Sequence, residues 1–344
     1  MRALVIGGTG FIGSRVVKRL HHLGHEVSVF HRGQHEGDLP ADVRHLHGEW
    51  LAGLRDAAPL GSSGPDVVLH MRPFGEADAR IVTEVFKGRA GRVVAISSID
   101  VYRAYGRFQG TETGEPDPTP LGEDAPLRQR LYPYRQDPPR SPNDPDYWMD
   151  DYEKILVERI ALGEPSLPGT VLRLPMVYGP GDVQHRFFGY LKRMDDRRGA
   201  ILLDEGLAQW RATRGYVEDV AAAIVAAVVN ERAQGRTYNV GEAQALPEAD
   251  WVRAIGRVVG WHGDVLTVPR DQLPAQLAWD FDTRQHWAVD TTRIRAELGY
   301  AEEASREEAL RRTIDWERTH PPESIDPGRF DYASEDTVLG SVRS

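Results

Sequence analysis

The clearest chemical signal in the sequence is a glycine-rich run, GGTGFIG, at residues 7–13. It fits both the G-x-G-x-x-G pattern and the related G-x-x-G-x-x-G pattern. Bare glycines let the backbone approach a pyrophosphate, and the free N–H groups at the start of a following helix attract its negative charge. The run therefore predicts a dinucleotide-binding loop rather than a tight turn without a ligand. Its predicted contact residues are Gly7, Gly10, Phe11, Ile12 and Gly13.

The residues after the next apolar run indicate which dinucleotide to expect. The sequence there is Phe30-His31-Arg32-Gly33, with a cation where NAD-binding proteins carry an acid for the ribose hydroxyls. Because Arg32 suits a 2′-phosphate, the sequence favours NADP, and NAD is the alternative if Arg32 is only a solvated charge. His31 is expected beside the adenosine half, and Glu49 is expected to hydrogen-bond the adenine.

The elements that must position this loop alternate between short apolar runs and amphipathic stretches. That alternation is typical of a parallel sheet covered by helices on both faces. An α/β fold with a Rossmann-type doubly wound parallel sheet is therefore predicted. The expected strands cover residues 3–6, 27–30, 43–46, 67–69, 93–96, 170–174 and 237–240. The expected helices include residues 13–23, 76–87, 147–162 and 217–230.

The stretch from residue 107 to residue 146 carries nine prolines, which excludes regular structure there. Such a long irregular segment favours an active-site lid over a linker, because aromatic residues within it suggest docking. The remaining domain boundaries follow from changes in composition and in hydrophobic pattern along the chain. We expect a dinucleotide-binding domain (1–177 and 211–241), a smaller, discontinuous, mainly helical substrate lobe (178–210 and 242–318) and a peripheral tail (319–344).

The composition excludes several other classes of protein. The chain of 344 residues has a net charge of −10 and no basic block, so nucleic acid is an unexpected partner. Without cysteine there is no disulfide framework and no thiol nucleophile. No apolar run approaches the roughly 20 residues that span a bilayer, and the start of the chain does not resemble a signal peptide. A cytoplasmic protein acting on a small molecule is expected.

The histidines also raise the question of a metal. Twelve are present, and His45 and His47 alternate on one face of a predicted strand, where they could chelate an ion. No acid or cysteine completes a known ligand spacing around them. The prediction is therefore that the protein has no metal site.

Four stretches of the sequence together resemble the extended short-chain dehydrogenase/reductases, the NAD-dependent epimerase/dehydratase family. They are VIGGTGFIGSRVV (5–17), VVAISSIDVY (93–102), KILVE (154–158) and VLRLPMVYGPGD (171–182). The resemblance implies an NAD(P)-dependent oxidoreductase, epimerase or dehydratase that transfers a hydride at a hydroxyl- or keto-bearing carbon of a sugar-like or natural-product substrate. It also implies a homodimer in which the helices beginning near Glu76 and Tyr147 pair.

The resemblance further implies a serine after the fifth strand and a Tyr-x-x-x-Lys pair on the following helix. The serine and tyrosine would act at the reacting oxygen, and the lysine would hold the nicotinamide ribose. Matching the motifs puts the serine at Ser98 and the lysine at Lys154. Counting back four residues from Lys154 reaches Asp150, so the tyrosine of the pair is missing. A non-standard proton donor is therefore expected.

Several groups could be that donor. Asp150 could serve itself, or it could form only an exposed i,i+4 ion pair with Lys154. Tyr152 would face another side of a regular helix, and Tyr147 would share the face of the lysine about two turns away. A distorted first turn would bring either tyrosine into play. The candidates from the lid are Tyr132 and Tyr134.

The same resemblance implies further contacts with cofactor and substrate. Met71, Pro175 and Val177 would line the cofactor together with Lys154. Arg72 stands where the family usually has a small residue, and it would either reach an anionic group or point to solvent. The residues expected at the substrate are Arg72, Ser98, Asp100, Tyr102, Tyr178, Arg211 and Arg214.

A second class of function fits the broken tyrosine pair. The chain could be a dinucleotide-binding sensor or scaffold that has lost its acid, or an RNA-associated protein. The retained Ser98 and Lys154 favour the enzyme, and the acidic net charge argues against RNA.

Overall fold

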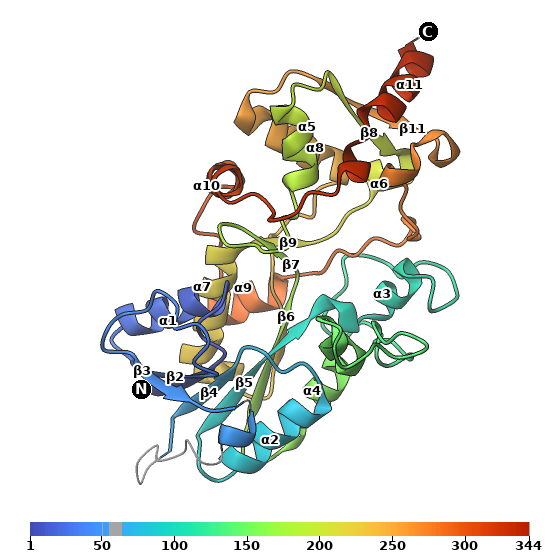
Figure 1. The fold of residues 1–344 in the computed structure, drawn as a ribbon. Helices are drawn as coiled ribbons and strands as arrows, with labels where there is room; N and C mark the ends of the chain where they lie inside the picture. Colours follow the sequence, from blue (N-terminus) through green and yellow to red (C-terminus); the bar gives the residue numbers. More distant parts are fainter. Residues whose placement is uncertain (50, 55–63, 344) are drawn as a thin grey trace.

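A central sheet organises the computed structural model, which describes residues 1–49, 51–54 and 64–343 (Figure 1). Within the described residues the sheet has seven parallel strands in the order β10-β6-β5-β4-β1-β2-β3. The prediction of a doubly wound parallel sheet is confirmed. Its strands are β1 (Arg2–Ile6), β2 (Glu26–His31), β3 (Arg44–His47), β4 (Val67–His70), β5 (Arg92–Ser98), β6 (Gly169–Leu174) and β10 (Thr237–Asn239).

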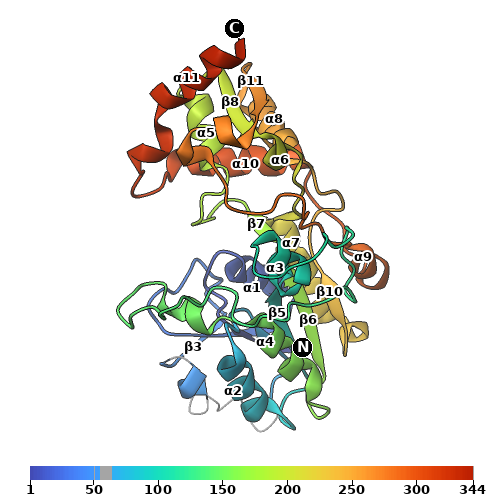
Figure 2. The same cartoon turned by 90° about the vertical axis from the view of Figure 1, so that its right-hand side faces the viewer.

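Helices cover both faces of this sheet because its strands are apolar on both sides. Ala3 and Val5 of β1 pack into a different cluster from Leu4 and Ile6, as alternation along a strand requires. One face is covered by α1 (Gly13–His22) and α7 (Val217–Val229), the other by α2 (Glu76–Phe86) and α4 (Lys154–Gly163). Figure 2 shows α2 and α4 lying together on their face.

The order of the strands locates the ligand-binding edge of the sheet. The chain moves outward from β1 to β2 and β3, then returns to β4 on the other side of β1. In open sheets of this kind, ligands bind beyond the carboxyl ends of the strands at this switch point. The glycine-rich run joins β1 to α1 at that point, and a cavity opens beside it.

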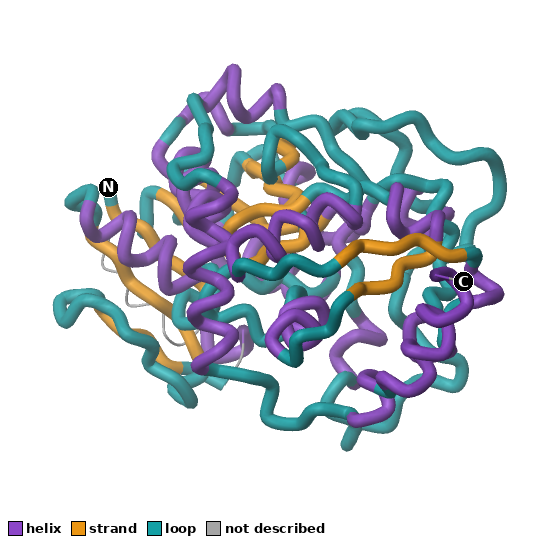
Figure 3. Tube along the Cα trace, turned by 90° about the horizontal axis from the view of Figure 1, so that it is seen from above, coloured by secondary structure: helices purple, strands orange, loops and turns teal. Residues whose placement is uncertain are grey.

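A smaller lobe lies above the sheet, at the end where β6 leads into β7 (Figures 1 and 2). β7 (Met176–Tyr178) and β9 (Arg214–Tyr216) pair where the chain enters and leaves this lobe. The lobe has two parallel strands, β8 (Ala200–Asp204) and β11 (Asp264–Val268), which Figure 3 shows apart from the main sheet. Its helices are α5 (Phe188–Asp195), α6 (Glu205–Gln209), α8 (Glu248–Val259), α10 (Arg306–Thr319) and α11 (Tyr332–Arg343).

Two parts of the chain depart from the expected division into domains. The segment α9 (Thr292–Leu298), expected in the lobe, packs against α7 and β10 of the sheet domain. The tail, expected to be peripheral, ends in α11, which is joined to the lobe by an ion pair between Arg193 and Glu335. Both side chains are almost fully buried, so this part of the tail belongs to the lobe. Because the first half of the tail is rich in proline, the sequence does not predict the helix that follows it.

The proline-rich segment is docked on the sheet domain. It follows α3 (Arg103–Phe108) and runs without long regular elements to residue 146. Within it Arg128 forms an ion pair with Glu153 at 3.2 Å, and the two side chains are 1% and 0% exposed. This buried ion pair joins the proline-rich segment to the residue that precedes α4 (Lys154–Gly163).

None of the helices in the described part of the chain is long and apolar enough to cross a bilayer.

Candidate active site

The glycine-rich run contains glycines that serve two different purposes. A Cβ on Gly13 would lie 2.6 Å from the carbonyl oxygen of Gly7, and one on Gly8 would lie 2.9 Å from Val17. These two glycines are required for the close approach of helix and strand. A Cβ on Gly10 would meet no described atom within 4 Å. The loop thus leaves room for a ligand at Gly10, and no side chain caps the start of α1 at Ile12.

A cavity of about 240 Å³ opens over this loop, lined by Gly7, Gly10, His31, Arg32, His70 and Arg72 among others. The side chain of Arg72 crosses Gly7, and it lies over the ring of Phe74 at 4.7 Å. Burial and the charge of Arg32 both lower the pKa of Arg72, which reflects two guanidinium groups facing one cavity. Such a pair suits the phosphates of a dinucleotide.

His70 gives a second indication that the cavity takes a polar ligand. Its Nε2 is buried and has no hydrogen-bond partner among the described residues. Burial, with a smaller effect from the charge of Lys154, lowers the pKa of His70 to about 3, so the imidazole is neutral. An unpaired buried nitrogen is costly, and a ligand in the cavity would supply its partner. The residues present therefore fit a bound dinucleotide.

The other residues predicted at the cofactor lie around this edge in different ways. Phe11 contacts Gly181 at the entrance to the lobe, and Met71 is buried in the core. Glu49 is exposed and does not line the cavity over the glycine loop. Pro175 packs near Gly215 and Gly241, and Val177 is buried at the start of the lobe.

The end of β5 brings together three partly buried hydroxyl side chains around one buried carboxylate. Asp100 is 2% exposed, and its Oδ2 accepts hydrogen bonds from the hydroxyls of Tyr134 and Tyr152, both at 3.0 Å. Its Oδ1 has no described partner. Ser98 lies two residues earlier, and its Oγ accepts the N–H of Asp100 at 3.2 Å. We call these four groups, together with Lys154, the catalytic corner: Ser98, Asp100, Tyr134, Tyr152 and Lys154.

Burial controls the protonation of this corner. It raises the pKa of Asp100, and it raises the pKa of Tyr134 and Tyr152 well above the ordinary tyrosine value, with a further contribution from the charge of Asp100. Both phenols therefore keep their protons at neutral pH and serve as donors.

Lys154 lies under the same corner. Its Nζ donates to the carbonyl oxygens of Ile96, at 3.1 Å, and of Pro73. Burial lowers the pKa of Lys154 to about 8. Its Nζ is 5.3 Å from the centre of the Tyr152 ring, so a positive charge faces that phenol.

An interruption of the predicted helix explains how Tyr152 reaches this position. The expected helix over residues 147–162 is wrong as a single element, because a 3-10 turn over Tyr147–Asp151 is followed by two extended residues before α4 begins. Glu153 is the N-cap of α4 and accepts the N–H of Ile155. Tyr152 would face away from Lys154 on one regular helix, but this interruption turns it toward Asp100 and Lys154, as a distorted first turn would.

Asp150 lies neither at the catalytic corner as a proton donor nor in an exposed ion pair with Lys154, the two positions predicted for it. Its carboxylate accepts the backbone N–H groups of Arg140, at 2.6 Å, and Gln136, at 3.3 Å, and forms an ion pair with the Arg140 side chain. It anchors the lid, and the expected i,i+4 ion pair with Lys154 is replaced by this one. Tyr147 is 44% exposed and lines a separate outer cavity with Trp148.

Several residues predicted at the substrate are instead structural. Tyr102 is fully buried, and its hydroxyl donates to Asn239 at 2.6 Å, so its assignment to the substrate is corrected. The hydroxyl of Tyr178 donates to Glu242 at 2.9 Å inside the lobe, and the same correction applies. Arg211 donates to the carbonyl oxygen of Ala245. Both tyrosine side chains are buried and hydrogen-bonded within the protein, which their motif positions alone do not reveal.

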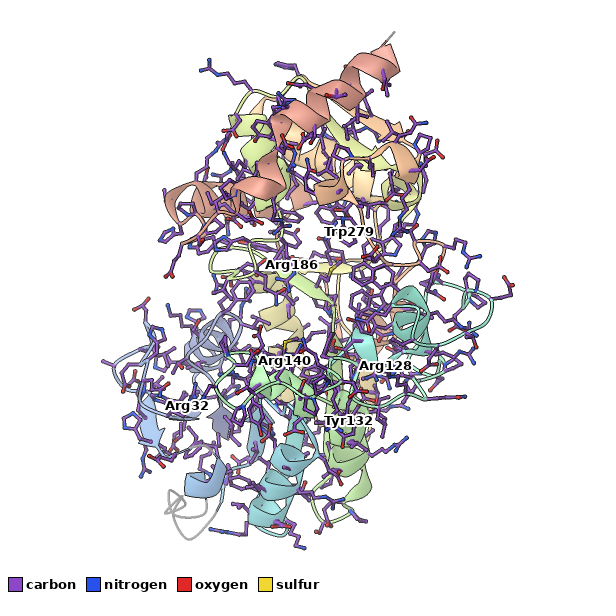
Figure 4. All side chains as sticks on the ribbon, turned by 45° about the vertical axis from the view of Figure 1, so that its right-hand side comes forward. Arg32, Arg128, Tyr132, Arg140, Arg186 and Trp279 are labelled. Carbon is purple, nitrogen blue, oxygen red and sulfur yellow. The ribbon has the colours of Figure 1, made fainter. Side chains whose placement is uncertain are left out.

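A second cavity, of about 480 Å³, lies in the lobe, and Met176 of β7 and Arg214 of β9 line it where the chain enters and leaves the lobe. Arg214 lines it while forming a buried ion pair with Glu248, at 2.8 Å. Arg186, Trp279 and Phe330 also line it, and Figure 4 shows the first two between the two parts of the molecule. No motif identifies these three residues in the sequence, because they come from the lobe and the tail.

The class of protein follows from a comparison with known families. The model of the NAD dependent epimerase/dehydratase family matches residues 3–123 and 131–241. The chain belongs to this family, so the predicted resemblance and the prediction of an NAD-dependent enzyme of this type are confirmed.

Among curated relatives, the chain is 27% identical over 284 residues to 2'-dehydrokanamycin reductase of Streptomyces kanamyceticus, covering 80% of this chain and 72% of the relative. It is 29% identical over 333 residues to a 3-diazoavenalumate denitrifying reductase of a Streptomyces species, covering 93% and 97%. Both are similar along most of their length.

Solved structures share the fold. An epimerase from Methanothermobacter thermautotrophicus matches with a TM-score of 0.66 and 19% identity over 92% of each chain. MoeE5, solved in complex with UDP-glucuronic acid and NAD, matches with a TM-score of 0.63 and 23% identity over 93% of this chain and 99% of its own. At this identity the likeness supports the fold.

Proposed function

We propose that this protein is an NADP-preferring reductase that converts a keto group of a sugar-like substrate to a hydroxyl group. The observation that carries the proposal is the hydrogen bond from Tyr152 to Asp100 beside Ser98, at the carboxyl edge of the sheet and above Lys154. The two curated relatives described above are named reductases, which supports this direction of the reaction.

Tyr152 takes the part of the missing tyrosine. Burial and the charge of Asp100 keep its phenol protonated, so a proton is available for a substrate carbonyl oxygen. Donation requires the hydroxyl to turn from Asp100 to that oxygen, and the charge of Lys154 to lower the raised pKa of the phenol. Ser98 donates a hydrogen bond to the same oxygen, and the charge of Lys154 stabilises the phenolate left behind. The nicotinamide supplies the hydride when bound, so hydride and proton together convert the carbonyl to an alcohol.

Asp100 and the lid orient this donor. Tyr152 shares Asp100 with Tyr134 of the lid, and the buried pair of Arg128 and Glu153 holds that part of the lid in place. Asp150 supports the lid in this proposal and does not transfer the proton.

The preference for NADP rests on Arg32 and Arg72, which both line the cavity over the glycine loop. The guanidinium group of Arg32 at the end of β2 suits a 2′-phosphate, as the sequence predicts. The cavity in the lobe would hold the rest of the substrate, because its arginines suit polar or anionic groups.

A homodimer is part of the proposal. Tyr147 and Trp148 expose 44% and 40% of their area beside α2, and Trp148 lies against Phe74 with the ring centres 4.5 Å apart. Exposed aromatic side chains of this kind are enriched in interfaces. Light scattering is expected to give a mass of twice 38.5 kDa. A mass of 38.5 kDa, that of the monomer, would contradict this part of the proposal.

The test of the catalytic assignment follows the nicotinamide absorbance with a panel of keto substrates. Tyr152→Phe is expected to lower kcat by about 10²–10⁴-fold, the usual contribution of a positioned acid, while dinucleotide binding is retained. Tyr147→Phe is the matched control, because it removes an exposed hydroxyl from the same segment, and full activity is expected.

Asp150→Asn separates the two readings of that residue. If Asp150 only anchors the lid, the variant keeps the pH profile of the wild type and loses some stability. A loss of activity as large as that of Tyr152→Phe would contradict the assignment of Tyr152. A protein that binds the dinucleotide and turns over no substrate in the panel would favour a sensor.

A further inference from the structure

Three histidines and one glutamate meet at the outer edge of the sheet, far from the catalytic corner. His31 ends β2, His45 and His47 belong to β3, and Glu36 comes from the loop that joins these strands. The parallel register sets His31 beside His47, and His45 shares the face of His47 two residues earlier. Glu36 lies between these histidines in the sequence without forming a known ligand spacing, and the fold brings its carboxylate to them.

The ligand atoms of the four side chains converge on one point. All of them lie within 4.8 Å of one another. His45 Nδ1 is 2.7 Å from Glu36 Oε2 and 2.8 Å from His31 Nε2, and His47 Nε2 is 3.1 Å from Glu36 Oε1. A tetrahedral ion with nitrogen ligands at about 2.0–2.1 Å keeps neighbouring ligand atoms roughly 3.4 Å apart, so small side-chain movements suffice to admit it.

The protons of this cluster cannot satisfy all of its short contacts. His31 Nδ1 accepts the backbone N–H of Gly33 at 3.2 Å, so its ring proton lies on Nε2 and points toward His45 Nδ1. A proton on His45 Nδ1 suits Glu36 and opposes the proton of His31. A lone pair on His45 Nδ1 suits His31 and opposes the carboxylate. A cation resolves the conflict, because it takes lone pairs from all of these atoms.

We propose that Glu36, His31, His45 and His47 form a binding site for a divalent transition metal of the zinc class. Three imidazoles and one carboxylate, without thiolates, suit zinc, cobalt, nickel or copper better than magnesium or calcium, which prefer oxygen ligands. The site can be filled from solvent, because Glu36 and His47 expose 55% and 51% of their side chains. Coordination through His31 Nε2 moves its proton to Nδ1 and gives up the long hydrogen bond from Gly33.

The position of the site links it to the proposed cofactor cavity. Arg32 directly follows His31, and Gln34 and His35 from the same loop line the cavity over the glycine loop. An ion held by Glu36 would tie this loop to β2 and β3. We therefore expect the metal to order the segment that contacts the adenosine end of the dinucleotide.

The test uses the full-length protein without an affinity tag, stripped with a chelator and titrated with Zn²⁺ and with Co²⁺. One equivalent is expected to bind, and Co²⁺ is expected to give the visible absorption bands of a tetrahedral site. His47→Ala and Glu36→Gln are each expected to weaken binding by more than about 100-fold, the upper end of the cost of losing a supporting group around a metal.

The matched control is the double variant His22→Ala with His262→Ala, which removes two exposed histidines outside the cluster. It is expected to bind the metal as the wild type does. Absence of saturable binding, or binding that the control weakens as much as His47→Ala and Glu36→Gln do, would overturn the proposal. These readouts need no substrate, so they remain valid if the reductase assignment fails. Weaker NADP binding after removal of the metal, in the wild type alone, would establish the link to the cavity.

Discussion

The glycine loop and the catalytic corner lie on the same edge of one sheet, and they are built in different ways. The loop is one continuous run, and its function depends on the backbone and on missing side chains, as at Gly10 and Gly13. The corner is assembled from β5, the lid and the residues before α4, and its function depends on side chains such as Asp100 and Tyr152. The loop shares its local geometry with many proteins, whereas the corner depends on the fold of this chain.

This difference predicts which changes each region tolerates. A backbone site tolerates polar changes nearby and fails when a Cβ is added in the wrong place. A side-chain site assembled from distant segments fails when the contacts that hold those segments are lost. Four experiments address the two regions separately.

The largest effect is expected from loss of the buried ion pair behind the corner. Arg128→Met leaves Glu153 without its charged partner, and such changes lower the free energy of unfolding by about 3–5 kcal/mol. Urea denaturation measures this loss. Arg80→Met removes a guanidinium from the exposed pair with Glu76 and is expected to cost less than about 0.5 kcal/mol. Equal losses in the two variants would mean that the lid is not anchored through Glu153.

Two glycines of the loop are expected to respond differently to the same substitution. Gly13→Ala forces a Cβ against the carbonyl oxygen of Gly7, and overpacking of this kind costs about 1–3 kcal/mol, which a lower Tm would reveal. Gly10→Ala adds a Cβ in open space, so the Tm is expected to stay and the affinity for NADP to fall. A change in Tm at Gly10 without a change in affinity would remove Gly10 from the ligand site.

The protonation of Lys154 is expected to shape the pH dependence of the corner. Because its pKa is lowered to about 8, kcat/KM is expected to fall as pH rises above that value, by about tenfold per unit. The unfolded chain binds more protons than the folded protein between about pH 8 and 10.5. The free energy of unfolding of the wild type therefore rises over this window relative to Lys154→Met. A basic limb unchanged in Asp100→Asn, which lacks the charge that raises the pKa of Lys154, would argue against this assignment.

The smallest effect is expected at the adenosine end of the cavity. Arg32→Glu is expected to lower the preference for NADP over NAD by about tenfold, the scale of one hydrogen bond to a charged group. Dissociation constants for both dinucleotides measure the ratio. Arg44→Glu makes the same charge change at an exposed position on β3 and is expected to leave the ratio unchanged. Equal binding of both dinucleotides by the wild type would contradict the assignment of Arg32 to the 2′-phosphate of NADP.

The sequence alone determined the sheet, the glycine loop and the class of enzyme. Strands buried on both faces are continuous apolar runs, so β1 and β5 can be read directly from the chain. The glycine loop can also be predicted from the sequence, because its seven residues act through local backbone geometry. The motif positions of Ser98 and Lys154 also predict the carboxyl edge at which the structure brings them together.

Only the tertiary structure decided which groups meet at that edge. Tyr152 reaches Asp100 because α4 begins at Lys154, and a helix boundary moved by a few residues changes the direction of every side chain before it. The Asp150 carboxylate points to the lid because it binds the backbone N–H groups of Gln136 and Arg140 and the side chain of Arg140 there. Glu36 joins the histidines because the loop between β2 and β3 brings its carboxylate to His45 and His47. Contacts between distant segments depend on how the segments pack, so they cannot be predicted from residue spacing along the chain.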